Sequence, residues 1–212
     1  MQIVPAIFEK DYKVVVEKLN LLRESGVKTV QIDVCDGEFS EGRSFDLEML
    51  NDYEFALEFV WEVHLMVKEP IKWLEKCKEV GVLRVYGQVE MMSDAEKFLE
   101  TAHEMGFEAG LAFDIETTLP EELPMDTDGI ILLARKAGFE AKPFEEKVYI
   151  KIEEAKKIQD DMGIPFTIAV DGGIEEKHLG KLREIGVNEA NCTHLVFDGN
   201  VSENLQRLNN LV

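Results

Sequence analysis

Residues 12–37 read YKVVVEKLNLLRESGVKTVQIDVCDG, and this stretch contains one complete structural unit. Apolar residues spaced three to four apart predict an amphipathic helix over 12–24, with Val15, Val16, Leu19 and Leu22 on its buried face. Gly26 predicts the end of that helix, because helices commonly stop at a glycine in the left-handed conformation. A continuous apolar run over 29–34 then predicts a strand that is buried on both faces.

The same order of helix, glycine and strand recurs at Gly81, Gly106 and Gly186. Strands are predicted over residues 2–7, 29–34, 59–67, 83–88, 108–113, 129–133, 165–170 and 188–192. Helices are predicted over residues 12–24, 71–79, 93–104, 146–162, 175–185 and 201–211, with single turns at 46–54 and 118–123. A capping box formed by Ser93-Asp94-Ala95-Glu96 is expected to open the helix over 93–104.

Eight such units without a change of composition between them predict one domain over residues 1–212, a single (β/α)8 TIM barrel. The alternative is an open, doubly wound sheet. That fold often carries a glycine-rich dinucleotide loop after its first strand, whereas this chain has Pro5-Ala6-Ile7-Phe8 there. The closed barrel is therefore favoured, and its chemistry is expected at the carboxyl ends of the strands.

The composition limits the environments in which this chain can work. Hydrophobic residues make up 45% of it, enough for a substantial core, and the net charge is −20 at pH 7. Nucleic acids and anionic membranes would repel so acidic a protein, so neither is expected as a partner. Residues 1–8 form no basic leader, no segment reaches the roughly 18 apolar residues of a membrane span, and the cysteines are scattered. We expect a cytoplasmic protein with reduced thiols.

Polar side chains stand at the ends of three predicted strands. Strand alternation places Gln31 and Asp33 on one face, which points into the barrel mouth if the apolar residues between them pack against helices. His64 lies in the last part of the third strand, and Asp171 follows the seventh, just before Gly172-Gly173. Read singly, Asp33 could be a loop cap and His64 a hydrogen-bonded core residue. Together they would converge on the barrel axis.

Such a convergence has specific chemical uses. Carboxylate and imidazole ligands suit a divalent cation such as Zn, Mn or Fe. Two carboxylates on opposite sides of a bound carbon also suit two-base proton transfer, in which one removes a proton and the other returns one to the opposite face. A metal would stabilise the enediolate oxygen formed between these steps. Backbone N–H groups at Gly172-Gly173 could cradle an anion such as phosphate.

Several short motifs then occur in a characteristic order. They are Val4-Pro5-Ala6-Ile7, Ile32-Asp33-Val34-Cys35-Asp36-Gly37, His64-Leu65-Met66-Val67, Gly110-Leu111-Ala112 with Thr117, Ala137-Gly138-Phe139, and Val170-Asp171-Gly172-Gly173-Ile174. Through these motifs the chain resembles the ribulose-phosphate 3-epimerase family over nearly its whole length, as a divergent member.

The resemblance implies a barrel enzyme of carbohydrate metabolism, an isomerase of the pentose phosphate pathway that interconverts ribulose 5-phosphate and xylulose 5-phosphate. It implies that Asp33 and Asp171 are the acid/base pair and also ligate a divalent metal, with His64 and Gln31 as further ligands. The positions implied to contact the phosphorylated sugar are Ala6, Met66, Gln88, Gly138, Gly172, Gly173, Thr193 and His194. No organic cofactor is implied, and family members often form homo-oligomers.

The chain departs from the family at the metal and sugar positions. Gln31 and Gln88 stand where the family has histidines, and Ala6 replaces a serine. An amide oxygen binds zinc more weakly than imidazole does, so Mn or Mg becomes plausible beside Zn and Fe.

The phosphate loops depart further. Ala137-Gly138-Phe139-Glu140-Ala141-Lys142 replaces Pro-Gly-Phe-Gly-Gly-Gln, and Thr193-His194 replaces a Gly-Ser pair. Side-chain cations could compensate for the lost backbone donors, and the candidates are Arg43, Arg135, Lys136 and Lys142, although these could equally be solvated surface residues. Two alternatives to the first function remain: a barrel that lost the reaction and serves as a binding or scaffold protein, and an epimerase for another ketose.

Overall fold

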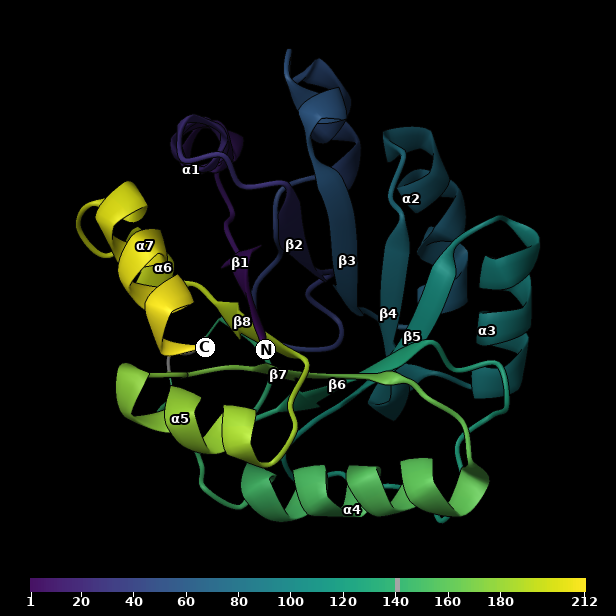
Figure 1. The fold of residues 1–212 in the computed structure, drawn as a ribbon. Coiled ribbons are helices and arrows are strands. Elements are labelled where there is room, and N and C mark those ends of the chain that lie inside the picture. Colours follow the sequence, from purple (N-terminus) through teal and green to yellow (C-terminus); the bar gives the residue numbers. More distant parts are fainter. Residues whose placement is uncertain (140–141) are drawn as a thin grey trace.

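Figure 1 shows the strands at the centre of the molecule and the helices around them, in the computed structural model, which describes residues 1–139 and 142–212. The strands are β1 (Gln2–Ile7), β2 (Thr29–Cys35), β3 (Val60–Met66), β4 (Arg84–Gln88), β5 (Glu108–Phe113), β6 (Gly129–Leu133), β7 (Thr167–Asp171) and β8 (Glu189–Cys192). They pair in parallel in chain order, and β8 pairs with β1. The predicted TIM barrel is therefore confirmed. The open-sheet alternative is wrong, because β8 pairs with β1 and the sheet therefore has no edge strand, whereas an open sheet has two.

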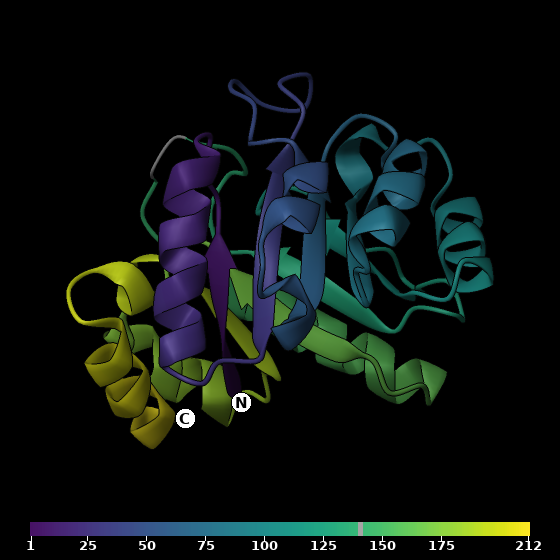
Figure 2. The ribbon, with the colours of Figure 1, turned by 90° about the horizontal axis from the view of Figure 1, so that it is seen from above.

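The helices are α1 (Tyr12–Glu24), α2 (Leu74–Val80), α3 (Ala95–Glu104), α4 (Val148–Met162), α5 (Glu176–Glu184), α6 (His194–Phe197) and α7 (Val201–Leu211). Short 3-10 helices are η1 (Leu47–Asp52), η2 (Ala56–Glu58), η3 (Pro70–Trp73) and η4 (Val89–Met91). Every predicted helix is present within a few residues of its expected bounds. In the two views, α1 and α7 lie beside β1 and β8, and α4 lies outside β6 and β7 (Figures 1 and 2).

Two predicted turns had different outcomes. The turn at 46–54 is the 3-10 helix η1, which together with η2 replaces a full helix between β2 and β3. Residues 118–123 are all described and contain no helical turn. Pro120 within this segment and Pro124 just after it lack the backbone N–H that a helix needs, and this explains the irregular path.

Glycines end the helices as the sequence predicted. Gly26, Gly81, Gly106 and Gly186 have φ values of 75°, 77°, 92° and 87°, which lie in the left-handed region that side chains disfavour. Each turn directs the chain from a helix into the next strand, so the repeated motif builds the repeated βα unit.

The N-cap of α3 lies one residue after the Ser93 of the predicted capping box. Asp94 is the cap, and its side chain accepts a hydrogen bond from the backbone N–H of Lys97 at 2.9 Å. Ser93 instead donates its hydroxyl to Glu69 at 2.9 Å. A carboxylate accepts a helix N–H more strongly than a hydroxyl does, so Asp94 takes the capping position.

The strands separate two kinds of interior. Outward-facing residues such as Ile32, Val34 and Val63 belong to the apolar core between strands and helices. Inward-facing residues include a small apolar cluster of Tyr86, Ala112, Ile131, Leu133 and Ala169. Many other inward-facing residues are polar or charged, and the buried ones include Gln31, Asp33, Glu62, His64, Gln88, Glu189 and Asn191. The predicted alternation along β2 is therefore present, and it delivers polar groups to the barrel axis.

An ionic cluster closes the amino-terminal end of the barrel. The Arg84 guanidinium contacts Glu62 at 2.8 Å, Glu108 at 2.8 Å and Glu189 at 3.1 Å. These residues come from β3, β4, β5 and β8, so one arginine links strands on different sides of the barrel. Sequence reasoning did not single out this cluster. Within the described residues, no helix has the length and apolar character needed to cross a membrane.

Candidate active site

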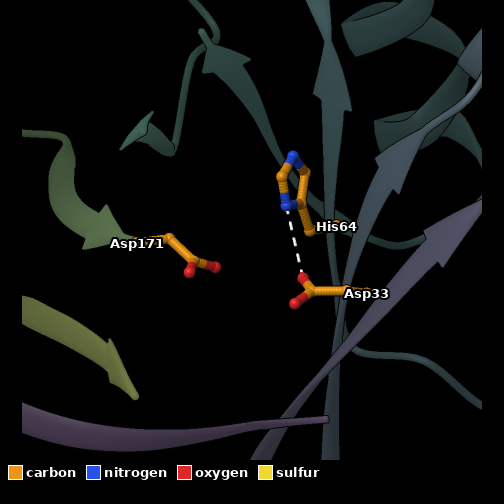
Figure 3. A group of neighbouring side chains, drawn as sticks. All are labelled: Asp33, His64 and Asp171. Carbon is orange, nitrogen blue, oxygen red and sulfur yellow. Dashed lines mark ion pairs between the residues drawn. The ribbon is translucent and has the colours of Figure 1, made fainter. Parts of the chain in front are cut away.

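Asp33, His64 and Asp171 lie together in the barrel although they are far apart in the sequence (Figure 3). They project from β2, β3 and β7, and one ligand atom of each lies within 4.8 Å of the others. Oδ1 of Asp33 is 3.3 Å from Nδ1 of His64, and Figure 3 shows the Asp171 carboxylate directed towards this pair. The predicted convergence of these three side chains is present.

Gln31 connects the two carboxylates. Its amide nitrogen donates to Oδ1 of Asp33 at 2.8 Å and to Oδ2 of Asp171 at 2.6 Å. Its carbonyl oxygen is turned the other way and accepts a hydrogen bond from the Asn191 amide. In this arrangement the nitrogen of Gln31, and not its oxygen, faces the predicted metal position. Ligation by Gln31 would require the amide to turn over, so its role as a ligand stays a prediction.

His64 is held from the opposite side of its ring. Nε2 lies 2.6 Å from Oε1 of Gln88, and both side chains are buried. Because a carbonyl oxygen only accepts, Nε2 carries the proton and donates to Gln88. Nδ1 faces Asp33, is buried, and has no hydrogen-bond partner among the described residues. The ring is thus oriented with one nitrogen available towards the carboxylates.

Burial and charge perturb this group of residues. Burial and then the neighbouring Asp33 carboxylate raise the pKa of Asp171 above its ordinary value, against the opposing effects of His64 and Gln31. Burial lowers the pKa of His64, but the Asp33 and Asp171 carboxylates outweigh it and raise the pKa on balance. A carboxyl group whose pKa is raised can give and take a proton near neutral pH, as a general acid or base must.

Two adjoining cavities surround the site. A small one, of about 20 Å³, lies between Asp33, His64 and Asp171, and it is also lined by Met66, Gly138 and Gly172. A larger one, of about 500 Å³, is lined by Asp171, Gly172, Gly173, Thr193 and His194. Six of the eight predicted sugar-binding positions therefore line one of these cavities.

The other two predicted sugar-binding positions lie behind the cavities. Ala6 and Gln88 are fully buried and line neither cavity. Gln88 contacts His64, and the carbonyl oxygen of Ala6 accepts a hydrogen bond from the Thr193 hydroxyl at 3.0 Å. Their contact with a sugar stays a prediction, and what the structure shows is that each supports a neighbouring candidate residue.

The four candidate cations do not form one cluster. Arg135 lines both cavities of the site, whereas Lys136 and Lys142 line a third cavity of about 740 Å³, which shares Ala137 and Gly138 with the small one. Arg43 pairs with Asp46 at 3.3 Å on the surface. Arg135 fits against Gly172, because a Cβ atom there would lie 2.7 Å from Cγ of Arg135. Glu140 and Ala141, the changed loop positions, lie outside the described residues.

Two features of the site were missed from the sequence. Asn191 was visible as a polar residue inside an apolar strand, at a position that alternation directs inward beside Glu189. The second feature is a stack between Phe8 and Phe139, whose ring centroids are 3.8 Å apart and which both line the larger cavity. No sequence pattern predicts this pair, because the two residues come from loops on different strands.

The closed parallel barrel, with two carboxylates and an imidazole converging near the carboxyl ends of its strands, defines a (β/α)8-barrel protein with an enzyme-type site. The chain belongs to the ribulose-phosphate 3-epimerase family, whose model matches residues 2–197. This membership confirms the predicted resemblance and the predicted enzyme class, an isomerase that acts on carbohydrates.

Individual relatives agree with this assignment. The chain is 24% identical over 186 residues to a ribulose-phosphate 3-epimerase of Aquifex aeolicus, covering 87% of this chain and 84% of the relative. It is 27% identical over 191 residues to that of Chlamydia muridarum, covering 88% and 83%.

Solved structures agree on the fold alone. A phosphoribosyl anthranilate isomerase from Thermus thermophilus superposes with a TM-score of 0.67 at 15% identity, over 100% of this chain and 98% of that one. A tryptophan synthase alpha-subunit from Pyrococcus furiosus superposes with a TM-score of 0.64 at 15% identity, over 98% and 95%.

Proposed function

We propose that this protein is a metal-dependent epimerase that interconverts ribulose 5-phosphate and xylulose 5-phosphate by two-base proton transfer at C3. The observation that carries the proposal is the meeting of Asp33, His64 and Asp171 beside a cavity in a chain of this family. One carboxylate removes the C3 proton from one face of the sugar, and the other delivers a proton to the opposite face.

The residues present fit a divalent cation. Two carboxylates and one imidazole form a common ligand set for Zn, Mn or Fe, and the carboxylates would also serve Mg. The buried Nδ1 of His64 makes no hydrogen bond to the described residues although it lies 3.3 Å from Oδ1 of Asp33, and Nε2 of the same ring donates to a carbonyl, as in many metal-binding histidines. A cation held by Asp33, His64 and Asp171 would supply charge stabilisation for the enediolate oxygen.

Arg135 is our candidate for recognition of the substrate's phosphate. It lies at the junction of the small cavity, where the carboxylates meet, and the larger cavity lined by Gly172 and Gly173. If a sugar bound with its reacting carbon beside Asp171 and its phosphate in the larger cavity, it would lie next to the Arg135 guanidinium. The paired N–H donors of a guanidinium match the geometry of a phosphate group. A second candidate function is an epimerase for another ketose. It rests on the same meeting of Asp33, His64 and Asp171, and it is favoured by the phosphate-loop residues, which differ from those of the family.

The test is turnover of ribulose 5-phosphate in a coupled assay with Zn, Mn, Fe or Mg added, alongside metal analysis of the purified protein. Asp33→Asn and Asp171→Asn should each lower kcat by roughly 10²–10⁴-fold while the melting temperature stays close to that of the wild type. Asp160→Asn, at an exposed position of α4, is the matched control. Near-normal turnover in either site variant would refute the assignment.

The substrate is tested separately from the reaction. Turnover of other phosphorylated or unphosphorylated ketoses, with none of ribulose 5-phosphate, would favour the second candidate. A folded protein that binds no metal and turns over none of these sugars would favour the scaffold alternative. The cytoplasmic location and a homo-oligomeric state stay predictions.

A further inference from the structure

A chain of buried amides and carboxylates runs across the barrel from β8 to β7. Asn191 on β8 donates to the carbonyl oxygen of Gln31 on β2, and Gln31 donates to both Asp33 and Asp171. Gln31 is fully buried and Asn191 nearly so. The contacts therefore occur where solvent cannot substitute for a missing partner.

The direction of each hydrogen bond in this chain is determined by chemistry. An ionised carboxylate only accepts, so the Gln31 side that faces Asp33 and Asp171 must be its NH2 group. That group has two hydrogens, and each carboxylate receives one of them. The carbonyl of Gln31 must then face away, and the group that meets it must be a donor. Asn191 supplies that donor with its own NH2 group.

The orientation has a consequence for the two carboxylates. Asp33 and Asp171 repel each other when both are charged, and burial strengthens that repulsion. A single NH2 group bonded to both at 2.8 and 2.6 Å offsets the repulsion and sets their separation. If the Gln31 amide turned over, its oxygen would face two carboxylates and add to the repulsion. The same oxygen would, however, become available as a ligand for a cation.

We propose that Asn191 is a positioning residue that keeps the Gln31 amide turned with its NH2 group towards Asp33 and Asp171. Gln31 then clamps the acid/base pair and does not ligate the metal. The consequence for catalysis rests on the proposed function, whereas the orientation of the amide does not. Asn191 touches neither carboxylate through a described hydrogen bond, so it acts through Gln31.

The first readout is the side-chain NH2 signal of Gln31 in 15N-labelled, metal-free protein at pH 8, assigned by its loss in Gln31→Leu. In the wild type this signal should exchange slowly with solvent. Asn191→Leu, which has a similar volume but no donor, should speed that exchange at least about tenfold. Gln88→Leu is the control, because it removes another buried amide that does not contact Gln31. An unchanged Gln31 signal in Asn191→Leu would overturn the proposal.

The second readout separates positioning from simple damage to the fold. In Asn191→Leu the carbonyl oxygen of Gln31 loses its hydrogen bond and can turn towards a cation, so the variant should bind Zn or Mn at least about threefold more tightly. Its kcat should fall about tenfold while KM changes little. A merely structural role would weaken metal binding and stability together. In a Gln31→Leu background, Asn191→Leu should have no further effect on metal affinity. Additive effects would contradict the proposal.

Two outcomes need separate handling. If Asn191→Leu does not fold, Asn191→Ala removes the same donor with less steric risk and takes its place in both measurements. If the wild type shows no epimerase turnover, the proposed function fails, but the exchange rate of the Gln31 signal still decides whether Asn191 orients the amide.

Discussion

Nε2 of His64 lies 2.6 Å from Oε1 of Gln88 inside the barrel, and this contact leaves Nδ1 of the same ring directed towards Asp33. When the ring is neutral, the bond selects the tautomer in which Nδ1 carries a lone pair. The same bond fixes the plane of the ring relative to Asp33. A histidine oriented in this way needs little reorganisation to bind a cation.

We therefore expect Gln88→Leu to weaken metal binding. The variant removes the acceptor of the Nε2 proton and frees the ring to rotate or to change tautomer, which should raise the dissociation constant for Zn by roughly 10–100-fold. Calorimetric titration of metal-free protein measures the change. Gln206→Leu, an exposed change on α7, is the control and should bind zinc as the wild type does. Unchanged affinity in Gln88→Leu would show that the contact does not prepare the ring.

Arg135→Ala should impair recognition of a phosphorylated sugar more than the chemical step. The guanidinium lies between the reacting centre and the larger cavity, so its loss should raise KM about tenfold or more with a smaller change in kcat. Arg43→Ala is the matched control, because that arginine pairs with Asp46 on the surface. Steady-state kinetics of both variants give the answer. If KM does not rise in Arg135→Ala, phosphate recognition lies elsewhere.

The ionic cluster at the amino-terminal end should make stability depend on pH. Burial and then the nearby Glu189 raise the pKa of Glu62 from an ordinary value of 4.5 to about 7. The folded state therefore holds this proton more tightly than the unfolded chain does. The contribution of protonated Glu62 to the stability of the fold is therefore complete below about pH 4.5 and is lost as the pH rises through about 7.

Glu62→Gln should remove that dependence. At pH 8.5 the variant should be more stable than the wild type by about 1–3 kcal/mol, and near pH 5 the difference should shrink, since each unit of pKa shift corresponds to about 1.4 kcal/mol. Urea unfolding at both pH values measures it. Glu108→Gln is the comparison variant, because it removes a half-exposed carboxylate that contacts the same arginine, Arg84. A variant less stable than the wild type at pH 8.5 would contradict the expectation.

Gly110 is needed inside the barrel for steric reasons. A Cβ atom at this position would lie 2.3 Å from the carbonyl oxygen of Gly129 and 2.6 Å from the Tyr86 ring. The obstructing atoms include backbone, so Gly110→Ala should destabilise the protein by about 2–4 kcal/mol or prevent folding. Gly180→Ala is the matched comparison. A Cβ atom there meets nothing within 4 Å, and Gly180 is an exposed residue of α5, so this change should stabilise by about 0.5–1 kcal/mol. Chemical unfolding of both variants checks the contrast.

Local patterns in the sequence were sufficient for the barrel. Helix periodicity over 12–24, left-handed glycines such as Gly26 and continuous apolar strands are properties of neighbouring residues, and they repeat because each βα unit repeats the same geometry. Alternation along β2 also predicted that Gln31 and Asp33 face inward. The segment over 118–123 was predicted less well, because Pro120 within it and Pro124 just after it lack the backbone N–H that a helical turn needs.

What the sequence determined by itself was which side chains reach the barrel axis, namely Asp33, His64 and Asp171, since alternation and strand ends are local. The tertiary structure decided what those side chains do to one another. The amide direction of Gln31 depends on Asn191 from a strand 160 positions away in the sequence, and the tautomer of His64 depends on Gln88 from the next strand. Hydrogen-bond direction follows from which donors and acceptors meet, and only the closed barrel brings these groups together.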